Sequence, residues 1–126
     1  MGTRTPVPVR EYMSESVETV TADTPLADAA QTMREQRINS LIVEGDEHAI
    51  LTSTDVVGVV ADRREITELT AVAVATTVIT TVEPDLPLTQ AASMMLRHES
   101  SHLPVVDGGE IVGILSQTDI ARSTTE

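Results

Sequence analysis

Apolar residues recur with helical spacing in two separate stretches of the chain, with polar residues between them. The apolar positions are Leu26, Ala29, Ala30 and Met33 in the first stretch, and Leu88, Ala91, Ala92 and Met95 in the second. Both sets follow the i, i+3, i+4, i+7 rule of a helix with one buried side. Pro25 precedes the first set, where a first-turn proline is tolerated. The pattern therefore predicts two one-sided helices.

Shorter apolar runs around these helices predict strands. The expected strands are residues 19–20, 40–43, 49–51, 103–106 and 111–115. The segments EGDEH and DGGE separate consecutive runs and read as hairpin turns, the second with a strong Asp-Gly signal. Two final helices are expected to begin near Asp55 and Asp119. Each half of the chain is thus predicted to contain a strand, a helix, two strands and a helix in that order. The expected fold is α+β, with two βαββα units.

The two halves are copies of one unit. Shifted by 62 positions, residues 19–43 (TVTADTPLADAAQTMREQRINSLIV) align with residues 81–105 (TVEPDLPLTQAASMMLRHESSHLPV), and shifted by 64, ILTSTD aligns with ILSQTD. Each copy of an internal repeat is expected to form one structural unit, so the repeat also sets the expected domain boundaries. These are an N-terminal tail (1–8), a first unit (9–63), a linker (64–70), a second unit (71–122) and a C-terminal tail (123–126).

The charge is unusual for a chain of 126 residues. Eight basic residues, all arginine, oppose 20 acidic ones, so the net charge is −12. Such a surface repels itself at low ionic strength, which favours a protein from the salt-loaded cytoplasm of a halophilic archaeon. Duplex DNA requires a basic face, so the composition argues against a nucleic-acid partner.

Other features of the sequence exclude several kinds of protein and site. The absence of cysteine excludes disulfides, zinc–thiolate sites and cysteine nucleophiles. No apolar run approaches the roughly 20 residues of a membrane span. The N-terminus lacks the apolar centre of a signal peptide, so we expect a cytoplasmic protein without a membrane partner. Three scattered histidines, no Gly-rich phosphate loop and no visible nucleophile–base pair favour a protein that is not an enzyme and holds no metal.

One motif carries candidate chemistry in both repeats. Ser116 precedes Asp119 by three residues at a strand-to-helix turn, and Thr52 precedes Asp55 in the same way. The spacing is that of a capping box, in which each side chain bonds the backbone of the other residue. The same turn could instead bind a nucleotide, because free N–H groups at a helix start attract phosphate and an ionised Asp accepts bonds from a ribose diol. Both interpretations stay open on the motif alone.

The duplicated order of these motifs resembles a tandem pair of cystathionine-β-synthase (CBS) domains, also called a Bateman module. The resemblance rests on the TPLADAA and LPLTQAA helix starts and on SHLPVVDGGEIVGILSQTDI, and it covers about residues 10–122. It implies two units packed sheet to sheet with pseudo-twofold symmetry, leaving two clefts for an adenosyl ligand: AMP, ADP, ATP or S-adenosylmethionine. In the family, the Asp of the motif holds ribose and the preceding hydroxyls hold phosphate.

The resemblance also implies the residues of each cleft. The first cleft would be lined by Met13, Glu18, Ile38, Asn39, Ser101, His102, Ser116, Thr118 and Asp119. The second would be lined by Asn39, Ser40, Thr52, Thr54, Asp55, Ala75, Thr80, Ser100 and Ser101.

Two departures from the family pattern separate the repeats. His102 occupies a position that is often basic in the family, whereas its counterpart Ser40 carries no charge. Gly113 matches a common family glycine, whereas its counterpart is Ala49. Phosphate binding is therefore expected to be weaker at the second cleft. His48 and His98 are expected at the surface, and the methionines Met33, Met94 and Met95 are expected to fill the core.

We therefore expect a sensor that needs no cofactor, binds an adenosyl nucleotide as a regulatory ligand and signals to a partner protein. The resemblance also implies a homodimer, formed through apolar residues that the helices leave exposed. Those residues are expected to include Val56, Val57, Val59 and Val60. The alternative is a ligand-free module that only dimerises, in which the Ser/Thr-x-x-Asp turns are caps and nothing more.

Overall fold

The computed structural model describes residues 6–15, 17–78 and 80–124. Residues 1–5 and 125–126 of the expected tails lie outside these ranges. The strands are β1 (Thr19–Thr21), β2 (Ser40–Glu44), β3 (Ala49–Thr52), β4 (Thr76–Thr77), β5 (His102–Asp107) and β6 (Glu110–Ser116). The helices are α1 (Leu26–Gln36), α2 (Ser53–Ala61), α3 (Ala71–Val74), α4 (Leu88–His98) and α5 (Gln117–Ser123), with 3-10 turns η1 (Val9–Glu11) and η2 (Ile66–Glu68). This mixed architecture confirms the predicted α+β class.

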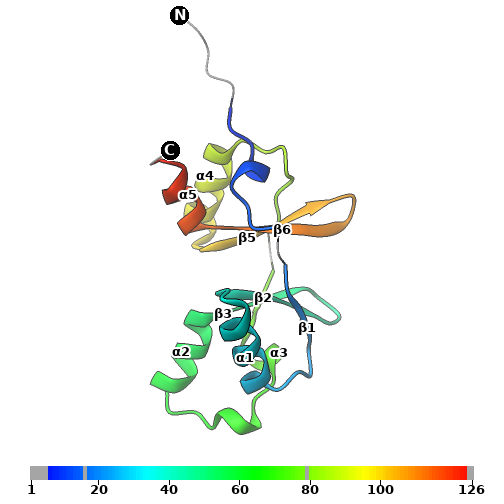
Figure 1. Ribbon diagram of the computed structural model, residues 1–126, viewed down its shortest axis with the longest axis vertical. Coiled ribbons are helices and arrows are strands. Elements are labelled where there is room, and N and C mark those ends of the chain that lie inside the picture. The colour runs from blue at the N-terminus through cyan, green and yellow to red at the C-terminus, as the bar shows by residue number, and fades with distance from the viewer. Residues whose placement is uncertain (1–5, 16, 79, 125–126) are drawn as a thin grey trace, which may run out of the picture. The chain divides into compact units, whose positions relative to one another are not determined.

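The chain forms two compact units, each of which contains one copy of the aligned repeat. One unit consists of Glu18–Ile79, and we call it the Asp55 unit. The other combines Met1–Val17 with Thr80–Glu126, and we call it the Asp119 unit. The segment that precedes each repeat thus belongs to the unit of the other repeat. In Figure 1 the blue N-terminal segment accordingly lies with the yellow-to-red elements.

The Asp55 unit is built on a four-stranded sheet of order β1-β2-β3-β4. β1 runs parallel to β2, and the other two pairings are antiparallel. Its helices lie on one side of this sheet (Figure 1). The apolar positions that predicted α1 point into the core, where Leu26, Ala29 and Met33 pack with Leu41 and Leu51.

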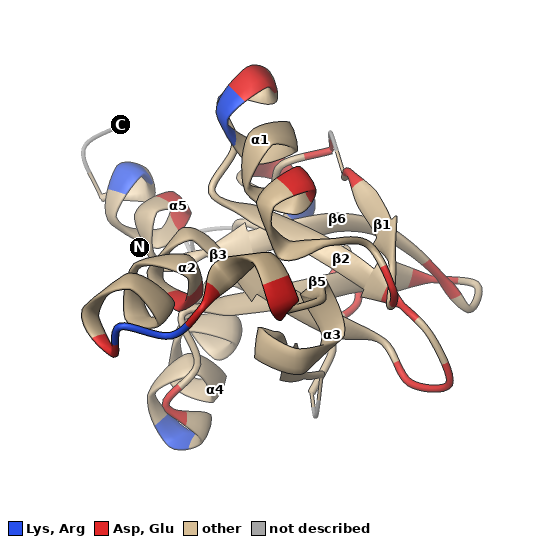
Figure 2. Cartoon of the chain, turned by 90° about the horizontal axis from the view of Figure 1, so that it is seen from below, with Lys and Arg blue, Asp and Glu red and all other residues tan. Residues whose placement is uncertain are grey.

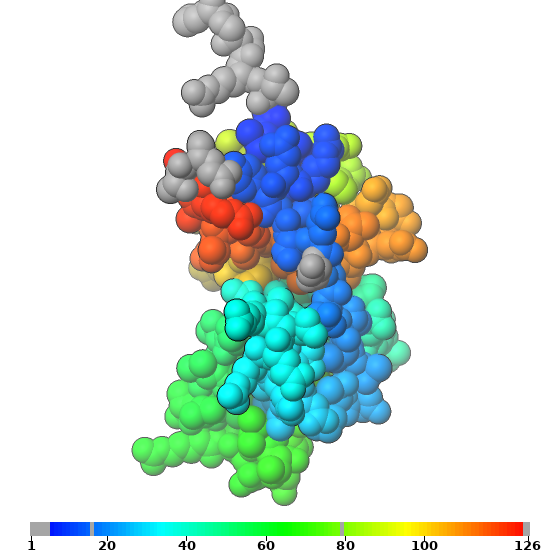
Figure 3. Space-filling model, viewed as in Figure 1, coloured from blue at the N-terminus to red at the C-terminus, as the bar shows by residue number. Residues whose placement is uncertain are grey.

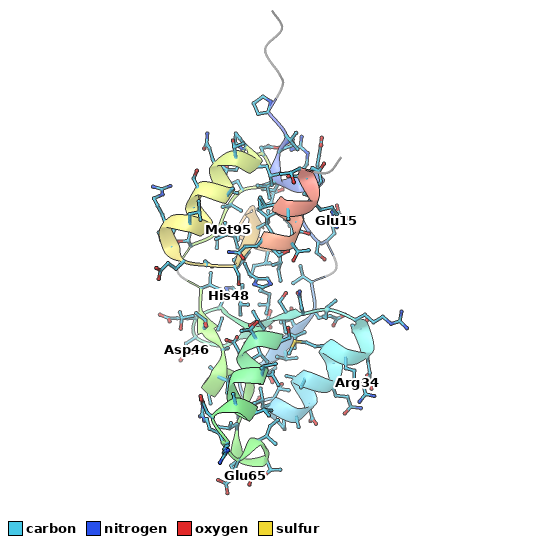
Figure 4. The ribbon with its side chains drawn as sticks, turned by 90° about the vertical axis from the view of Figure 1, so that its left-hand side faces the viewer. Glu15, Arg34, Asp46, His48, Glu65 and Met95 are labelled. Atoms are coloured by element: carbon cyan, nitrogen blue, oxygen red, sulfur yellow. The ribbon has the colours of Figure 1, made fainter. Side chains whose placement is uncertain are left out.

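The Asp119 unit is built on the β5–β6 hairpin, with α4 and α5 on one of its faces (Figure 1). Met95 of α4, labelled in Figure 4, is buried with Leu103 and Leu115 in the core of this unit. Val9 of the N-terminal segment is fully buried in the same core. The described end of the expected tail is attached as well, because the Leu88 N–H donates to the Val7 carbonyl over 2.8 Å.

The first strand of the second repeat is shorter than the repeat predicts. Only Val82 pairs there, in a single parallel bridge to Val105. The Val82 N–H donates to Pro104 over 3.0 Å, and the Val106 N–H donates to Val82 over 2.8 Å. Extending this parallel ladder in either direction would require an N–H from Pro104 or Pro84, and proline has none. The prolines therefore limit the strand to one residue.

The expected exposed face of α2 needs a correction. Val59 is buried and Val56 is half-buried against the same core, so neither is available to a partner. Val57 and Val60 are 65% and 68% exposed, as expected. The helix turns by about 100° per residue, so valines at positions 56, 57, 59 and 60 cannot all share one face.

The remaining predictions about side-chain placement hold in large part. Met33 and Met95 are buried, and Met94 packs half-buried against the core. His98 is exposed, and so is His48, which Figure 4 labels with Asp46 in the turn between β2 and β3. Figure 2 shows acidic residues on helices and turns of both units, with few basic residues among them. In the described part of the chain, no helix combines the length and the apolar composition that crossing a bilayer requires.

Candidate functional site

The turn between β3 and α2 holds Asp55 in a complete capping box. Thr52 ends the strand in an extended conformation and serves as N-cap of the helix. The Thr52 N–H donates to Oδ2 of Asp55 over 2.8 Å, and the Asp55 N–H donates to Oγ1 of Thr52 over 3.2 Å. Two backbone donors at the helix start are thereby satisfied, and the carboxylate is fixed in position.

The turn between β6 and α5 has the same geometry around Asp119. The Ser116 N–H donates to Oδ2 of Asp119 over 2.8 Å, and the Asp119 N–H donates to Oγ of Ser116 over 3.2 Å. The predicted capping box is therefore confirmed in both repeats. Asp119 is the more buried carboxylate, with a relative exposure of 9%.

The Asp55 unit brings several predicted site residues to this turn. Ser40 pairs with Thr52 across the β2–β3 ladder. The Ser53 N–H donates to the Asn39 carbonyl over 3.0 Å, so the start of α2 lies next to the start of β2. Thr54 is exposed in the first turn of α2. Ala75 instead packs half-buried against the hydrophobic core.

The Asp119 unit repeats this arrangement. His102 pairs with Ser116, and the Gln117 N–H donates to the Ser101 carbonyl over 3.0 Å. Oγ of Ser101 lies 2.9 Å from Nδ1 of the half-buried His102. Oγ of Ser100 donates to the His102 carbonyl over 2.8 Å. Serine hydroxyls thus flank the histidine at the start of β5.

Each predicted cleft draws its residues from both units. From the first predicted cleft, the Asp119 unit holds Met13, Ser101, His102, Ser116, Thr118 and Asp119, and the Asp55 unit holds Glu18, Ile38 and Asn39. From the second, the Asp55 unit holds Asn39, Ser40, Thr52, Thr54, Asp55 and Ala75, and the Asp119 unit holds Thr80, Ser100 and Ser101. Within each unit, the motif Asp and its strand neighbours are brought together by the hydrogen bonds described above.

The arrangement leaves acceptor capacity on both carboxylates. An ionised carboxylate has about four lone-pair sites, and the cap engages Oδ2 alone. Oδ1 can therefore accept hydrogen bonds from paired hydroxyl donors. The exposed hydroxyls of Thr54 and Thr118 lie one residue before each Asp, where they can donate to an anion at the helix start.

One neighbour of Asp119 was not anticipated. Nη2 of Arg122 lies 3.4 Å from Oδ1 of Asp119 and donates to the Tyr12 carbonyl over 3.1 Å. The i, i+3 spacing of Asp119 and Arg122 on a helix is a sequence signal for such a pair. The contact with Tyr12 has no sequence signal, because it depends on how the N-terminal segment docks.

Comparisons with known proteins agree with this architecture. A family model for the CBS domain matches residues 9–62 and 71–126. Hypoxic response protein 1 of Mycobacterium tuberculosis is 33% identical over 122 residues, which cover 93% of this chain and 85% of that protein. The uncharacterized protein MJ0188 of Methanocaldococcus jannaschii is 34% identical over 123 residues, which cover 95% of this chain but only 45% of that protein. The chain thus spans less than half the length of MJ0188.

A solved structure with the same fold contains adenosyl ligands. It is the CBS domain pair of protein MJ0100 in complex with 5′-methylthioadenosine and S-adenosyl-L-methionine, with a TM-score of 0.83, 25% identity and coverage of 96% of this chain and 98% of that one. A crystal structure of the hypoxic response protein contains two coordinated zinc ions. In the present chain, the described residues include no group of three or more His, Cys, Asp or Glu side chains placed to hold a metal ion.

The match therefore extends over both repeats and nearly the whole chain, in sequence as in fold. The chain belongs to the CBS domain family and carries two copies of the domain.

Proposed function

We propose that this protein is a regulatory module that binds adenosyl ligands at its two Ser/Thr-x-x-Asp turns and signals their presence to a partner protein. The observation that carries the proposal is the duplicated turn, in which a capping box orients the carboxylate and leaves Oδ1 as an acceptor. The adenosyl ligands of the MJ0100 domain pair support the ligand class.

The chemistry at each turn follows from the groups present. The two hydroxyls of a ribose would donate to Asp119 or Asp55, and a carboxylate accepts two such bonds without a change of protonation. The threonine hydroxyl and the free N–H groups of the helix start would hold a phosphate where the ligand carries one.

The Asp119 turn is proposed as the tighter site. The half-buried His102 begins the strand beside it, whereas the neutral Ser40 occupies that position beside Asp55. Asp119 is also more buried than Asp55, and a hydrogen bond to a charged group is stronger where water is excluded. AMP, ADP and ATP would therefore be held at the Asp119 turn first.

The second candidate function is a ligand-free interaction module. It is favoured by the completeness of the caps, since both boxes close without any ligand. The two candidates differ in one respect that is easy to measure, because only the first requires the protein to bind a ribonucleoside.

A thermal-shift screen tests the proposal. The protein is melted by circular dichroism with AMP, ADP, ATP, S-adenosylmethionine or 5′-methylthioadenosine, and with GMP as a control for the base. A ligand at about 100 times its Kd stabilises the folded state by about 2.7 kcal/mol, which is a rise of several degrees for a chain of this size. No rise with any adenosyl ligand at millimolar concentration would favour the ligand-free module.

We further propose that the module is a homodimer adapted to a salt-rich cytoplasm. Val57 and Val60 give α2 an apolar exposed edge, and light scattering should give about twice the chain mass of 13.5 kDa. The net charge of −12 predicts a higher melting temperature in about 3 M KCl than in about 0.05 M, because salt screens the repulsion. A monomeric mass would exclude the dimer, and equal melting temperatures would exclude the salt adaptation.

A further inference from the structure

The two candidate sites differ in a contact made by the third residue after each Asp. In the Asp119 unit this residue is Arg122, whose guanidinium faces Oδ1 of Asp119 at 3.4 Å. In the Asp55 unit the equivalent residue is Gly58, and a Cβ added there would meet nothing within 4 Å. Among the residues that the structure describes, an arginine thus forms an ion pair with the motif carboxylate of Asp119 and with no oxygen of Asp55.

Arg122 also holds a segment that is remote in sequence. Its Nη2 donates to the carbonyl of Tyr12 over 3.1 Å, and its guanidinium carbon lies 5.8 Å from the centre of the Tyr12 ring. Figure 3 shows the blue N-terminal segment lying beside the red C-terminal helix. One nitrogen therefore contacts both the candidate ribose acceptor and the N-terminal segment.

That segment, residues 7–14, docks along the Asp119 unit and is called the N-terminal strap here. The N–H groups of Val9 and Ser14 donate to Leu86 and Ile114 over 2.9 Å each. The strap lies so close to β6 that a Cβ at Gly113 would come within 2.6 Å of the Met13 sulfur. The strap is therefore closely packed against β6.

We propose that Arg122 couples the Asp119 carboxylate to the N-terminal strap, and that ligand hydroxyls compete with Arg122 for Oδ1 of Asp119. The second half rests on the proposed function. Arg122 is a positioning residue in this scheme, since it acts through Asp119 and the strap. Accepting a ribose hydroxyl weakens the attraction of Oδ1 for the guanidinium, and Arg122 then holds Tyr12 less firmly. Because coupling free energies are reciprocal, displacing the strap strengthens ligand binding by the same factor.

The magnitude of the coupling is small. The Arg122 side chain is 53% exposed, and ion pairs with an exposed partner contribute little because water and salt screen them. We therefore expect a change of about two- to fivefold in affinity, which calorimetry resolves.

The first experiment needs no ligand. Tyr12 is the only aromatic residue of the chain, so its fluorescence reports on the strap alone. Acrylamide quenching is compared in wild type, Arg122→Met, Arg122→Lys and Asp119→Asn, with Gly58→Ala in the other unit as a matched control. Asparagine keeps an oxygen that can accept the cap bond from Ser116, so the variant removes the charge and not the cap.

Arg122→Met and Asp119→Asn are each expected to increase quenching, and the double variant should add nothing beyond one of them. Arg122→Lys should restore part of the protection, and Gly58→Ala should leave quenching unchanged. Unaltered quenching in Asp119→Asn would overturn the coupling, whether or not any nucleotide binds.

The second experiment titrates adenosine, which carries no phosphate that Arg122 could attract. Saturating adenosine should increase Tyr12 quenching in wild type and leave it unchanged in Arg122→Met, and calorimetry should show about two- to fivefold tighter binding to that variant. Binding to wild type without a change in quenching would overturn the competition. A complete absence of adenosine binding would contradict the proposed function, while the ligand-free experiment would still decide the link between Asp119, Arg122 and the strap.

Discussion

The Asp55 unit contains a four-stranded sheet, whereas the Asp119 unit contains a two-stranded hairpin, although both derive from one repeated sequence unit. The difference begins at one pair of equivalent positions. The Ile42 N–H donates to the Glu18 carbonyl over 3.0 Å and continues the pairing of β1 with β2. Its counterpart Pro104 has no N–H, so the same pairing stops at Val82. Similar apolar patterns thus give a strand in one repeat and a one-residue bridge in the other, because Pro104 and Pro84 lack the N–H groups that would extend the pairing.

A second difference is an exchange of volume between neighbouring positions. Met13 lies over Gly113 in the Asp119 unit, whereas Ala75 packs against the core that includes Ala49 in the Asp55 unit. The Asp119 unit thus has methionine and glycine at the two positions where the Asp55 unit has two alanines. Close packing at each site therefore depends on the pair and not on either residue alone.

The largest effect is expected from removing the equivalent core leucines. Leu41→Ala and Leu103→Ala each delete a fully buried side chain, and each should lower the free energy of unfolding by about 2–5 kcal/mol. Similar losses would show that the two cores are equivalent despite their different sheets. Urea denaturation followed by circular dichroism measures both, and a loss below about 1 kcal/mol in either would contradict the packing described.

The pairing of Met13 with Gly113 predicts a smaller loss of stability when Gly113 is enlarged, and a partial recovery when Met13 is shortened. Gly113→Ala should cost about 1–3 kcal/mol, since the new Cβ overlaps the Met13 sulfur and lies 2.9 Å from the Ser14 carbonyl oxygen. Adding Met13→Ala recreates the pair of alanines found in the Asp55 unit and should recover part of the loss.

Gly58→Ala is the control, because its Cβ meets nothing and alanine favours a helix. Additive losses in the double variant would argue against the volume exchange.

The two caps should respond alike. Thr52→Ala and Ser116→Ala each remove the side-chain acceptor of one capping box, and each should cost about 1 kcal/mol. Thermal unfolding of the two variants provides the comparison. A loss confined to one repeat would mean that only one box stabilises its helix.

The smallest effect concerns the missing donor. Pro104→Ala supplies an N–H that can reach the Thr80 carbonyl, as the Ile42 N–H reaches Glu18 in the other unit. The gain of one hydrogen bond is about 1 kcal/mol and is offset by the loss of proline rigidity, so stability should barely change. Hydrogen exchange should nevertheless show a slowly exchanging amide at position 104, and rapid exchange there would contradict the explanation.

Much of this fold follows from sequence patterns that act locally. The 3.6-residue spacing predicted α1 and α4 with their buried faces, and the Ser/Thr-x-x-Asp spacing predicted both capping boxes. These features depend on residues a few positions apart, whose geometry the helix itself determines.

The features that were missed depend on distant segments. The docking of residues before each repeat onto the other repeat, and the contact of Arg122 with Tyr12 across 110 positions, arise only when the chain is folded. The shortened strand at Val82 could be predicted from the sequence only in part. Pro84 and Pro104 are visible in the sequence, but their effect requires knowing the register in which the two strands meet.

Calorimetric titration of AMP into wild type, Asp119→Asn and Asp55→Asn tests the central claim most directly, with 2′-deoxy-AMP as the second ligand. If Asp119 accepts the ribose hydroxyls, Asp119→Asn should weaken the tightest site at least about tenfold, because a hydrogen bond to a charged group contributes about 1.5–3 kcal/mol. Asp55→Asn should affect that site less, and the deoxy ligand should reproduce part of the Asp119→Asn loss in wild type. If AMP binds Asp119→Asn as tightly as wild type, Asp119 is only a helix cap and the proposed ligand site is wrong.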